Sequence, residues 1–427
     1  MKKTIVFFLA LAALCATAPA GLAQDAPRFA QIVRELSRAK YQGRGYARDG
    51  VRKARTYLVK EFEKAGVDEV TVQPFKIDIN TFSGRMAFSA DGRRLRAGID
   101  FSMREHSPGV NGEYPVYYVD TADFNPDRIF ADLAQPEWAD AMVCCDFMFT
   151  YKHRDVFKRL TTAGGSANRG VLYTWEAPLK FYKAYGEYVA DKPIIWVTPE
   201  ALAGARRVRL DIENTFLEGY ETENVIAKVS GARHDSCYVF TAHYDHLGNQ
   251  GRRVFYPGAN DNASGVATVL TLAEHFAKER PEYDMYFVAF SGEEANLRGS
   301  TYFAEHPVVP LSQIRFLFNI DMIGDDNREC YCELGDAGLP RFPRFEALNR
   351  ELSLFDALAR ADLAANSDHY PFAVRGVPCI FFMNEGSAFP YYHTPNDNMK
   401  TVRFDTYAPL FKLVVAAVER FDQTFEN

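Results

Sequence analysis

The alternation of strand-like and helix-like segments after residue 222 constrains the fold of this chain more than any other feature. Strand-like runs occur at 224–229, 238–242, 285–290, 315–320 and 377–382, with helical patterns at 264–278 and 404–421. The run at 285–290 is continuously apolar, which is typical of a strand buried on both faces. Strands that alternate with helices predict an α/β fold, a doubly wound and mostly parallel sheet flanked by helices.

The first 219 residues predict two further regions. Apolar residues at helical spacing predict helices at 28–39 and 49–65, the second ended by Gly66, and a strand follows at 70–79. Short strand-like runs and turns then fill 83–219, with one helix at 154–163 and no cluster of acids and histidines. We therefore predict residues 24–82 as the N-terminal part of the α/β domain, 83–219 as an inserted β-rich domain, and 220–427 as the main part.

The N-terminus has the three-part pattern of a secretory signal peptide. Lys2 and Lys3 precede an apolar run at 5–16, and small residues lead to Ala23. We predict a signal peptide over residues 1–23 and a secreted or periplasmic protein. Leu14 stands directly before Cys15 where a lipoprotein signal needs a small residue, which disfavours lipid anchoring. The apolar run is too short for a membrane span, and no later stretch is apolar enough for one.

Composition excludes several classes of protein. The formal charge is -7 without a run of like charge, so nucleic acid is not an expected partner. The chain has seven cysteines, six once the signal is removed, and an even number permits disulfides in an oxidising compartment. Their pairing cannot be read from the sequence, and neither can the oligomeric state. The CC and CxC spacings are poor zinc motifs.

Five short segments concentrate acids and histidines, each in a loop or just after a predicted strand. Alone, a histidine at a strand end, an aspartate before a helix or an exposed turn has an ordinary structural explanation. Adjacent glutamates after a buried strand are different, because burying them is unfavourable unless a cation is near. The segments contribute His243 with Asp245, then Asp261, Glu293 with Glu294, Asp321, and finally His393.

Together these segments supply two histidines, three carboxylates and a spare glutamate. Loops at the carboxyl ends of strands converge in open α/β sheets, so we expect these side chains to meet. Nitrogen and oxygen ligands of this kind suit a pair of divalent ions. In two-metal hydrolases such ions lie about 3.5–4 Å apart.

The motifs of this half of the chain resemble metallopeptidase family twenty-eight, the secreted bacterial zinc aminopeptidases and their relatives. The matching motifs are AHYDHLG (242–248), GANDNASG (258–265), SGEEANLRGS (291–300), NIDMIG (319–324), SDHYPF (367–372) and YHTPNDN (392–398). TENVIAKVSG (222–231) is similar to the family's entry into the catalytic domain. The placement of 83–219 is similar to that of the protease-associated domain of many members.

The resemblance implies two Zn²⁺ ions and peptide substrates. His243 and Asp321 would complete one metal site, Glu294 and His393 the other, and Asp261 would bridge the two. The peptide between Asp261 and Asn262 is expected to be cis.

The remaining roles also come from the resemblance. Glu293 would be the general base, taking a proton from the attacking water and returning it to the leaving amine. Asp245 would orient His243. Tyr392 could donate a hydrogen bond to the tetrahedral oxyanion. Asp368 would be a supporting acid behind the ligands.

The implied activity is that of an aminopeptidase, and three alternatives stay open. A glutaminyl cyclase would use a single zinc and release ammonia. A carboxypeptidase acting on acidic dipeptides belongs to the same class of enzymes. A non-catalytic binding protein would have lost its metal ligands, whereas all five ligands and Glu293 are present here.

Overall fold

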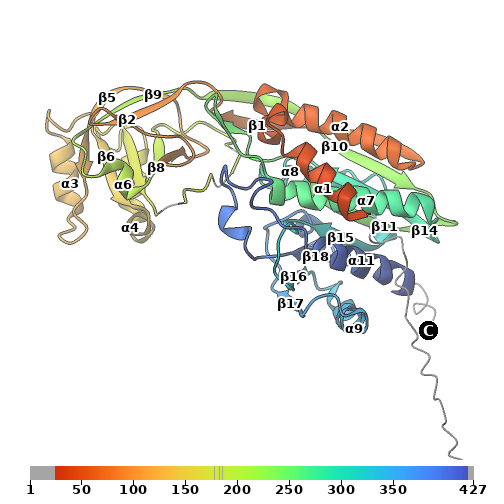
Figure 1. Ribbon diagram of the computed structural model, residues 1–427. Helices are drawn as coiled ribbons and strands as arrows, with labels where there is room; N and C mark the ends of the chain where they lie inside the picture. The colour runs from red at the N-terminus through yellow and green to blue at the C-terminus, as the bar shows by residue number, and fades with distance from the viewer. Residues whose placement is uncertain (1–24, 177, 182, 185, 422–427) are drawn as a thin grey trace, which may run out of the picture.

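The computed structural model describes residues 25–176, 178–181, 183–184 and 186–421. The signal peptide predicted over 1–23, with Cys15, lies outside the described residues. Figure 1 shows two lobes joined by long strands. The larger lobe is built on an eight-stranded sheet in the order β1-β10-β14-β11-β15-β18-β16-β17, and the smaller on another in the order β3-β2-β9-β5-β6-β7-β8-β4.

The sheet of the larger lobe is mixed, with a parallel centre. Strands β14, β11, β15 and β18 run parallel, whereas β10 and β16 join this group antiparallel. Its strands are β1 (Glu69–Thr81), β10 (Thr215–Val229), β11 (Arg233–His243), β14 (Tyr283–Phe290), β15 (Ile314–Ile320), β16 (Glu329–Leu334), β17 (Ala357–Ala361) and β18 (Cys379–Met383). The predicted α/β class is confirmed.

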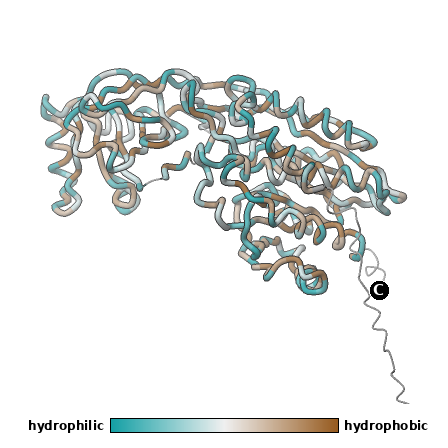
Figure 2. The backbone as a smooth tube through the Cα atoms, viewed as in Figure 1, coloured by the Kyte–Doolittle hydropathy of each residue, from teal (hydrophilic) through white to brown (hydrophobic). Residues whose placement is uncertain are grey.

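Helices cover both faces of this sheet. The first face carries α1 (Asp25–Leu36), α2 (Gly50–Ala65), α7 (Gly265–Lys278), α9 (Phe342–Leu352) and α11 (Tyr407–Phe421). The other carries α8 (Arg298–Glu305) and α10 (Tyr370–Ala373). Gly66 follows α2 with φ 80° and donates its N–H to Glu63, as predicted for a C-cap. Figure 2 shows hydrophobic stretches inside this lobe, while hydrophilic and hydrophobic residues alternate along the outer helices.

Strand β11 shows why the central strands of the sheet are continuously apolar in sequence. Phe240 and Ala242 pack into the core beneath α7, while Val239 faces the opposite core beneath α8 and α10. Successive side chains of a strand point to opposite faces, so a strand between two helical layers needs apolar residues at every position. The same holds for β14, where Phe287 and Val288 point to opposite cores.

The smaller lobe consists mainly of short strands, as predicted in general terms for residues 83–219. They are β2 (Met86–Ala90), β3 (Arg93–Arg94), β4 (Phe101–Met103), β5 (Val110–Tyr118), β6 (Met142–Asp146), β7 (Gly170–Thr174), β8 (Ile194–Val197) and β9 (Arg207–Ile212). Its helices are α3 (Pro126–Leu133), α4 (Phe147–Lys152), α5 (Arg154–Thr161) and α6 (Pro199–Leu202). The predicted boundary at residues 219 and 220 falls within β10, and the protease-associated identity stays a prediction.

The cysteines of the described residues are all buried free thiols, namely Cys144, Cys145, Cys237, Cys330, Cys332 and Cys379. Two of them lie on β16, an element that the sequence analysis did not predict. Within the described residues, no helix is both long and apolar enough to cross a bilayer.

A stack of aromatic rings across the parallel strands makes Phe240 a test of the core. Its ring lies 5.0 Å from that of Phe287 and 5.1 Å from that of Phe318, in both cases nearly parallel. We expect Phe240→Ala to lower the free energy of unfolding by about 3–5 kcal/mol in urea denaturation, because it removes a fully buried ring. Phe216→Ala, at a ring that is 36% exposed, is the matched control and should cost less than about 1 kcal/mol. Equal losses would contradict this description of the core.

Candidate metal centre

The acids and histidines of the five segments meet at the carboxyl edge of the parallel strands. His243 ends β11, Glu293 and Glu294 follow β14, and Asp321 follows β15. Parallel neighbours end at the same edge, which explains how residues distant in sequence come together. Asp261 lies in the turn before α7, and His393 comes from the loop after β18.

Asp261 is the shared element of the cluster. Its Oδ1 lies 3.3 Å from Nε2 of His243, and its Oδ2 lies 3.1 Å from Nε2 of His393. The two oxygens of one buried carboxylate therefore face two different histidines. The peptide between Asp261 and Asn262 is cis, as expected.

The first ligand group consists of His243, Asp261 and Asp321, whose ligand atoms lie within 4.8 Å of one another. Oδ2 of Asp321 lies 3.4 Å from Nε2 of His243. The Ser367 hydroxyl donates to that Oδ2 at 2.9 Å and accepts from the side-chain amide of Asn319 at 2.8 Å. This network fixes the orientation of the Asp321 carboxylate.

The second group contains Asp261, Glu294 and two histidines. Nε2 of His393 lies 3.4 Å from Oε2 of Glu294, and whether the two hold one ion stays a prediction. The ligand atoms of His246, Asp261 and Glu294 also lie within 4.8 Å of one another. Nδ1 of His246 is 2.7 Å from Oε1 of Glu294, although the angles are not those of a hydrogen bond. Both atoms are buried without a hydrogen-bond partner among the described residues.

The sequence analysis gave His246 no role. The imidazole is completely buried, and both of its nitrogens lack a hydrogen-bond partner among the described residues. A buried polar group without a partner is unfavourable and indicates a missing ion, ligand or water. The available signal was its place in AHYDHLG, three residues after His243.

Two further residues hold the loop that carries Asp261. Arg44, completely buried, donates to the carbonyl oxygens of Pro257 at 2.6 Å, Gly258 at 2.9 Å and Asp261 at 3.0 Å. From the other side, the carboxylate of Asp397 accepts the backbone N–H groups of residues 260 and 261 at 2.7 and 2.9 Å. The sequence analysis did not single out either residue.

Gly258 allows this close packing. It adopts φ +58°, and a Cβ atom there would lie 2.1 Å from the carbonyl oxygen of Asp261 and 2.5 Å from the His246 ring. Only glycine fits without displacing the loop.

Asp245 lies beneath the glutamate pair. Its carboxylate accepts the backbone N–H groups of Glu293 and Glu294, each at 3.3 Å, and the hydroxyl of Tyr46 at 2.6 Å. Nδ1 of His243 lies 3.1 Å from the Asp245 carbonyl oxygen but 3.7 Å from its carboxylate. The backbone of Asp245 is therefore the closer partner of the imidazole, while its side chain holds the loop of the two glutamates.

The remaining predicted residues border the cluster. The Tyr392 ring stacks on His393, with ring centres 3.7 Å apart. Asp368 is fully buried, and burial raises its pKa to about 7. Oε2 of Glu293 lies 3.7 Å from Nε2 of His243.

The cluster holds more negative than positive charge. Burial, together with the nearby carboxylates of Glu294, Asp368 and Asp321, raises the pKa of Glu293 well above its ordinary value. Burial also raises the pKa of Asp321, while the imidazole of His243 opposes the shift. Buried carboxylates that repel one another in this way are stabilised by cations.

The donor set also fits metal ions. Oδ1 of Asp321 and Oε1 of Glu294 are buried without a hydrogen-bond partner among the described residues. Imidazole nitrogens and carboxylate oxygens are ligands that zinc commonly takes. We conclude that the residues present fit divalent ions and that Asp261 belongs to both ligand groups.

Comparisons with known proteins agree with this geometry. Residues 224–418 match the family model described as Peptidase family M28. Aminopeptidase YwaD of Bacillus subtilis is 29% identical over 207 residues, covering 46% of this chain and 44% of the relative. An aminopeptidase of Pseudomonas aeruginosa is 32% identical over 186 residues, covering 42% of this chain and 32% of the relative. The chain thus spans less than half the length of these curated relatives.

Solved structures show the same fold over nearly the whole chain. BSAP, a zinc aminopeptidase from Bacillus subtilis, superposes with a TM-score of 0.70 at 22% identity, covering 93% of this chain and 94% of that one. The Peptidase M28 precursor from Shewanella amazonensis superposes with a TM-score of 0.69 at 19% identity, covering 92% and 93%.

The sheet and its paired ligand groups, with these matches, resemble those of metallopeptidases. The part of the chain that matches peptidase family M28 is residues 224–418, and this part carries the ligand groups.

The buried guanidinium of Arg44 provides a test of how the loop is held. We expect Arg44→Met to lower the free energy of unfolding by at least about 3 kcal/mol in urea denaturation, because several buried carbonyl groups lose their donor. Arg34→Met, at an exposed position of α1, is the matched control and should change stability by less than about 0.5 kcal/mol. A loss below about 1 kcal/mol for Arg44→Met would show that the loop does not depend on this residue.

Proposed function

We propose that this protein is a two-zinc aminopeptidase that hydrolyses the N-terminal peptide bond of peptides. The observation that carries the proposal is the carboxylate of Asp261, whose two oxygens face His243 and His393 at 3.3 and 3.1 Å. His243 and Asp321 would hold one ion, and Glu294 and His393 the other. His246 lies close enough to Glu294 to complete or support the second site.

When bound, two zinc ions would polarise the scissile carbonyl and lower the pKa of the attacking water. Glu293 would accept the proton of that water on its carboxylate and deliver it to the leaving amine nitrogen. Asp245 would keep Glu293 in position through the backbone N–H group that it accepts.

Tyr392 would donate its hydroxyl to the oxyanion of the tetrahedral intermediate. Burial and the carboxylates of Asp261 and Glu294 raise its pKa well above the ordinary value, so the phenol keeps its proton. A neutral donor aimed at developing charge stabilises the transition state. Stacking on His393 fixes the ring that carries this hydroxyl.

Zinc binding is the first test. We expect the chain to take up about two equivalents of zinc by elemental analysis, since Asp261 faces two ligand groups. Asp261→Asn should leave about one equivalent or none after dialysis, because it removes the shared charge. Asp362→Asn, at an exposed aspartate, should leave the stoichiometry unchanged. Two tightly held ions in Asp261→Asn would contradict the shared carboxylate.

Glu293→Gln separates the base from the ligands. We expect the variant to keep its zinc and its melting temperature, while kcat for an aminoacyl reporter falls by about 10²–10⁴-fold. Glu419→Gln, at an exposed glutamate of α11, should retain full activity. Full turnover in Glu293→Gln would show that another group serves as the base.

The products decide between related reactions. Release of free N-terminal residues, detected by mass spectrometry, supports the aminopeptidase. Ammonia released from glutaminyl peptides with one equivalent of zinc would indicate a cyclase, and shortening from the C-terminus would indicate a carboxypeptidase. Because of the predicted signal peptide, we further propose that the protein works outside the cytoplasm.

A further inference from the structure

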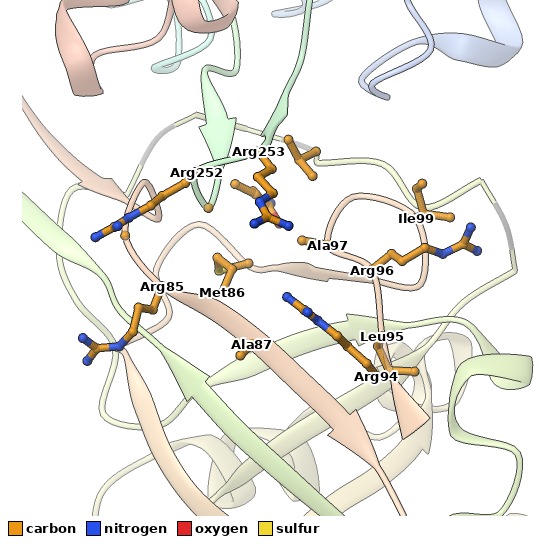
Figure 3. A pocket seen from close by; sticks show the side chains of 14 residues that line it. Arg85, Met86, Ala87, Arg94, Leu95, Arg96, Ala97, Ile99, Arg252 and Arg253 are labelled. Carbon is orange, nitrogen blue, oxygen red and sulfur yellow. The ribbon is translucent and has the colours of Figure 1, made fainter. Parts of the chain in front are cut away.

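A pocket of about 690 Å³ lies between the smaller lobe and a hairpin of the larger one. The hairpin consists of β12 (Asn249–Gln250) and β13 (Val254–Phe255). The apolar part of the lining includes Met86 and Ala87 from β2, and Leu95 and Ala97 from the following loop. Figure 3 shows the hairpin above the pocket and the strand of the smaller lobe below it.

Arginines surround this pocket, although the chain as a whole is acidic. The lining includes Arg85, Arg94, Arg96, Arg252 and Arg253, and no acidic side chain belongs to the described residues that line it. Arg85 is neutralised by Asp211 at 3.1 Å and Glu213 at 2.6 Å, and Arg96 by Asp100 at 2.9 Å.

Among these arginines, Arg94 and Arg253 are the two that direct their charge into the pocket. Figure 3 shows both guanidinium groups pointing into the pocket, one from the smaller lobe and one from the hairpin, whereas Arg252 points away. Neither has an ion-pair partner among the described residues, and both are exposed. Two like charges that converge over an apolar surface form a site for an anion.

The hairpin that carries Arg253 is held in place by the smaller lobe. The side-chain amide of Gln250 donates to the Ser102 hydroxyl at 2.9 Å, and the N–H of Gly251 donates to the Phe82 carbonyl at 2.6 Å. These bonds fix the hairpin before any ligand arrives, which lowers the entropy lost on binding.

The pocket lies close to segments that lead to the metal centre. A Cβ atom on Gly98, beside the lining residue Ala97, would lie 3.1 Å from the ring of Pro395, two residues after His393. It would also lie 3.3 Å from the hydroxyl of Tyr256, which precedes the loop of Asp261. The pocket and the segments that lead to His393 and Asp261 therefore meet near Gly98.

We propose that Arg94 and Arg253 bind a carboxylate of the peptide substrate, on the far side of the scissile bond. The inference rests on the proposed aminopeptidase function and names a preferred class of substrate, peptides with an acidic side chain or a free C-terminus at that distance. A guanidinium matches a carboxylate with two parallel hydrogen bonds. The apolar lining favours a carboxylate carried on a peptide over a bare inorganic anion.

The test is a binding experiment by isothermal titration calorimetry on the full-length, zinc-loaded Glu293→Gln protein. Four peptides are compared: Leu-Ala-Ala-Glu amide with Leu-Ala-Ala-Gln amide, and Leu-Ala-Ala-Ala free acid with its amide. In at least one of the two pairs, we expect the peptide with the carboxylate to bind about tenfold more tightly than its uncharged counterpart. The pair that responds distinguishes a side-chain carboxylate from the C-terminal one.

Substitutions then assign the preference to residues. Arg94→Met combined with Arg253→Met should abolish the preference, while Arg252→Met, the control on the same hairpin, should preserve it. Arg253→Glu should reverse the preference toward Leu-Ala-Ala-Lys amide, a change that a purely structural role would not produce.

Three results would overturn the proposal. The first is equal binding within both peptide pairs. The second is a loss of the carboxylate preference in Arg252→Met as large as in the double variant. The third is competition by inorganic phosphate at the concentration at which the acidic peptide binds. Hydrolysis of peptides without any preference for a carboxylate would contradict this inference but would still support the proposed aminopeptidase function. The opposite outcome would refute the proposed function: the peptides bind with a preference that depends on the arginines, but the unaltered protein hydrolyses none of them.

Discussion

The buried carboxylate of Asp261 is the constraint on which the centre depends. It stands between two histidines that lie far apart in the sequence, and each of its oxygens faces one of them. Such a carboxylate requires charge compensation, which Arg44 supplies only indirectly, through backbone carbonyl groups. Because buried acids outnumber bases around it, cations bound at the two ligand groups would compensate the negative charge.

The sheet explains why distant residues converge on this point. Parallel strands β14, β11 and β15 end at one edge, and each continues directly into a residue of the cluster. The helices on both faces bury the strands and leave that edge free for loops. The smaller lobe brings Gly98 close to Pro395, and its β2 faces the hairpin of the larger lobe across the arginine-lined pocket.

Much of this arrangement could be predicted from the sequence, because its signals are local. The apolar run at 285–290 indicated a buried strand, and the glutamates after it indicated a cation. The short strands β16 and β17 at one end of the sheet were not predicted, since short strands have a weak pattern that depends on neighbours. His246 and Arg44 were missed for a related reason. Their roles depend on burial and on partners distant in the sequence, as with Arg44 and Gly258.

The account is tested most directly by anomalous diffraction at the zinc edge from crystals of the zinc-loaded protein. We predict two anomalous peaks about 3.5–4 Å apart, one on each side of the Asp261 carboxylate, with His243 beside one and His393 beside the other. A single peak, or two peaks that do not share Asp261, would contradict the central claim.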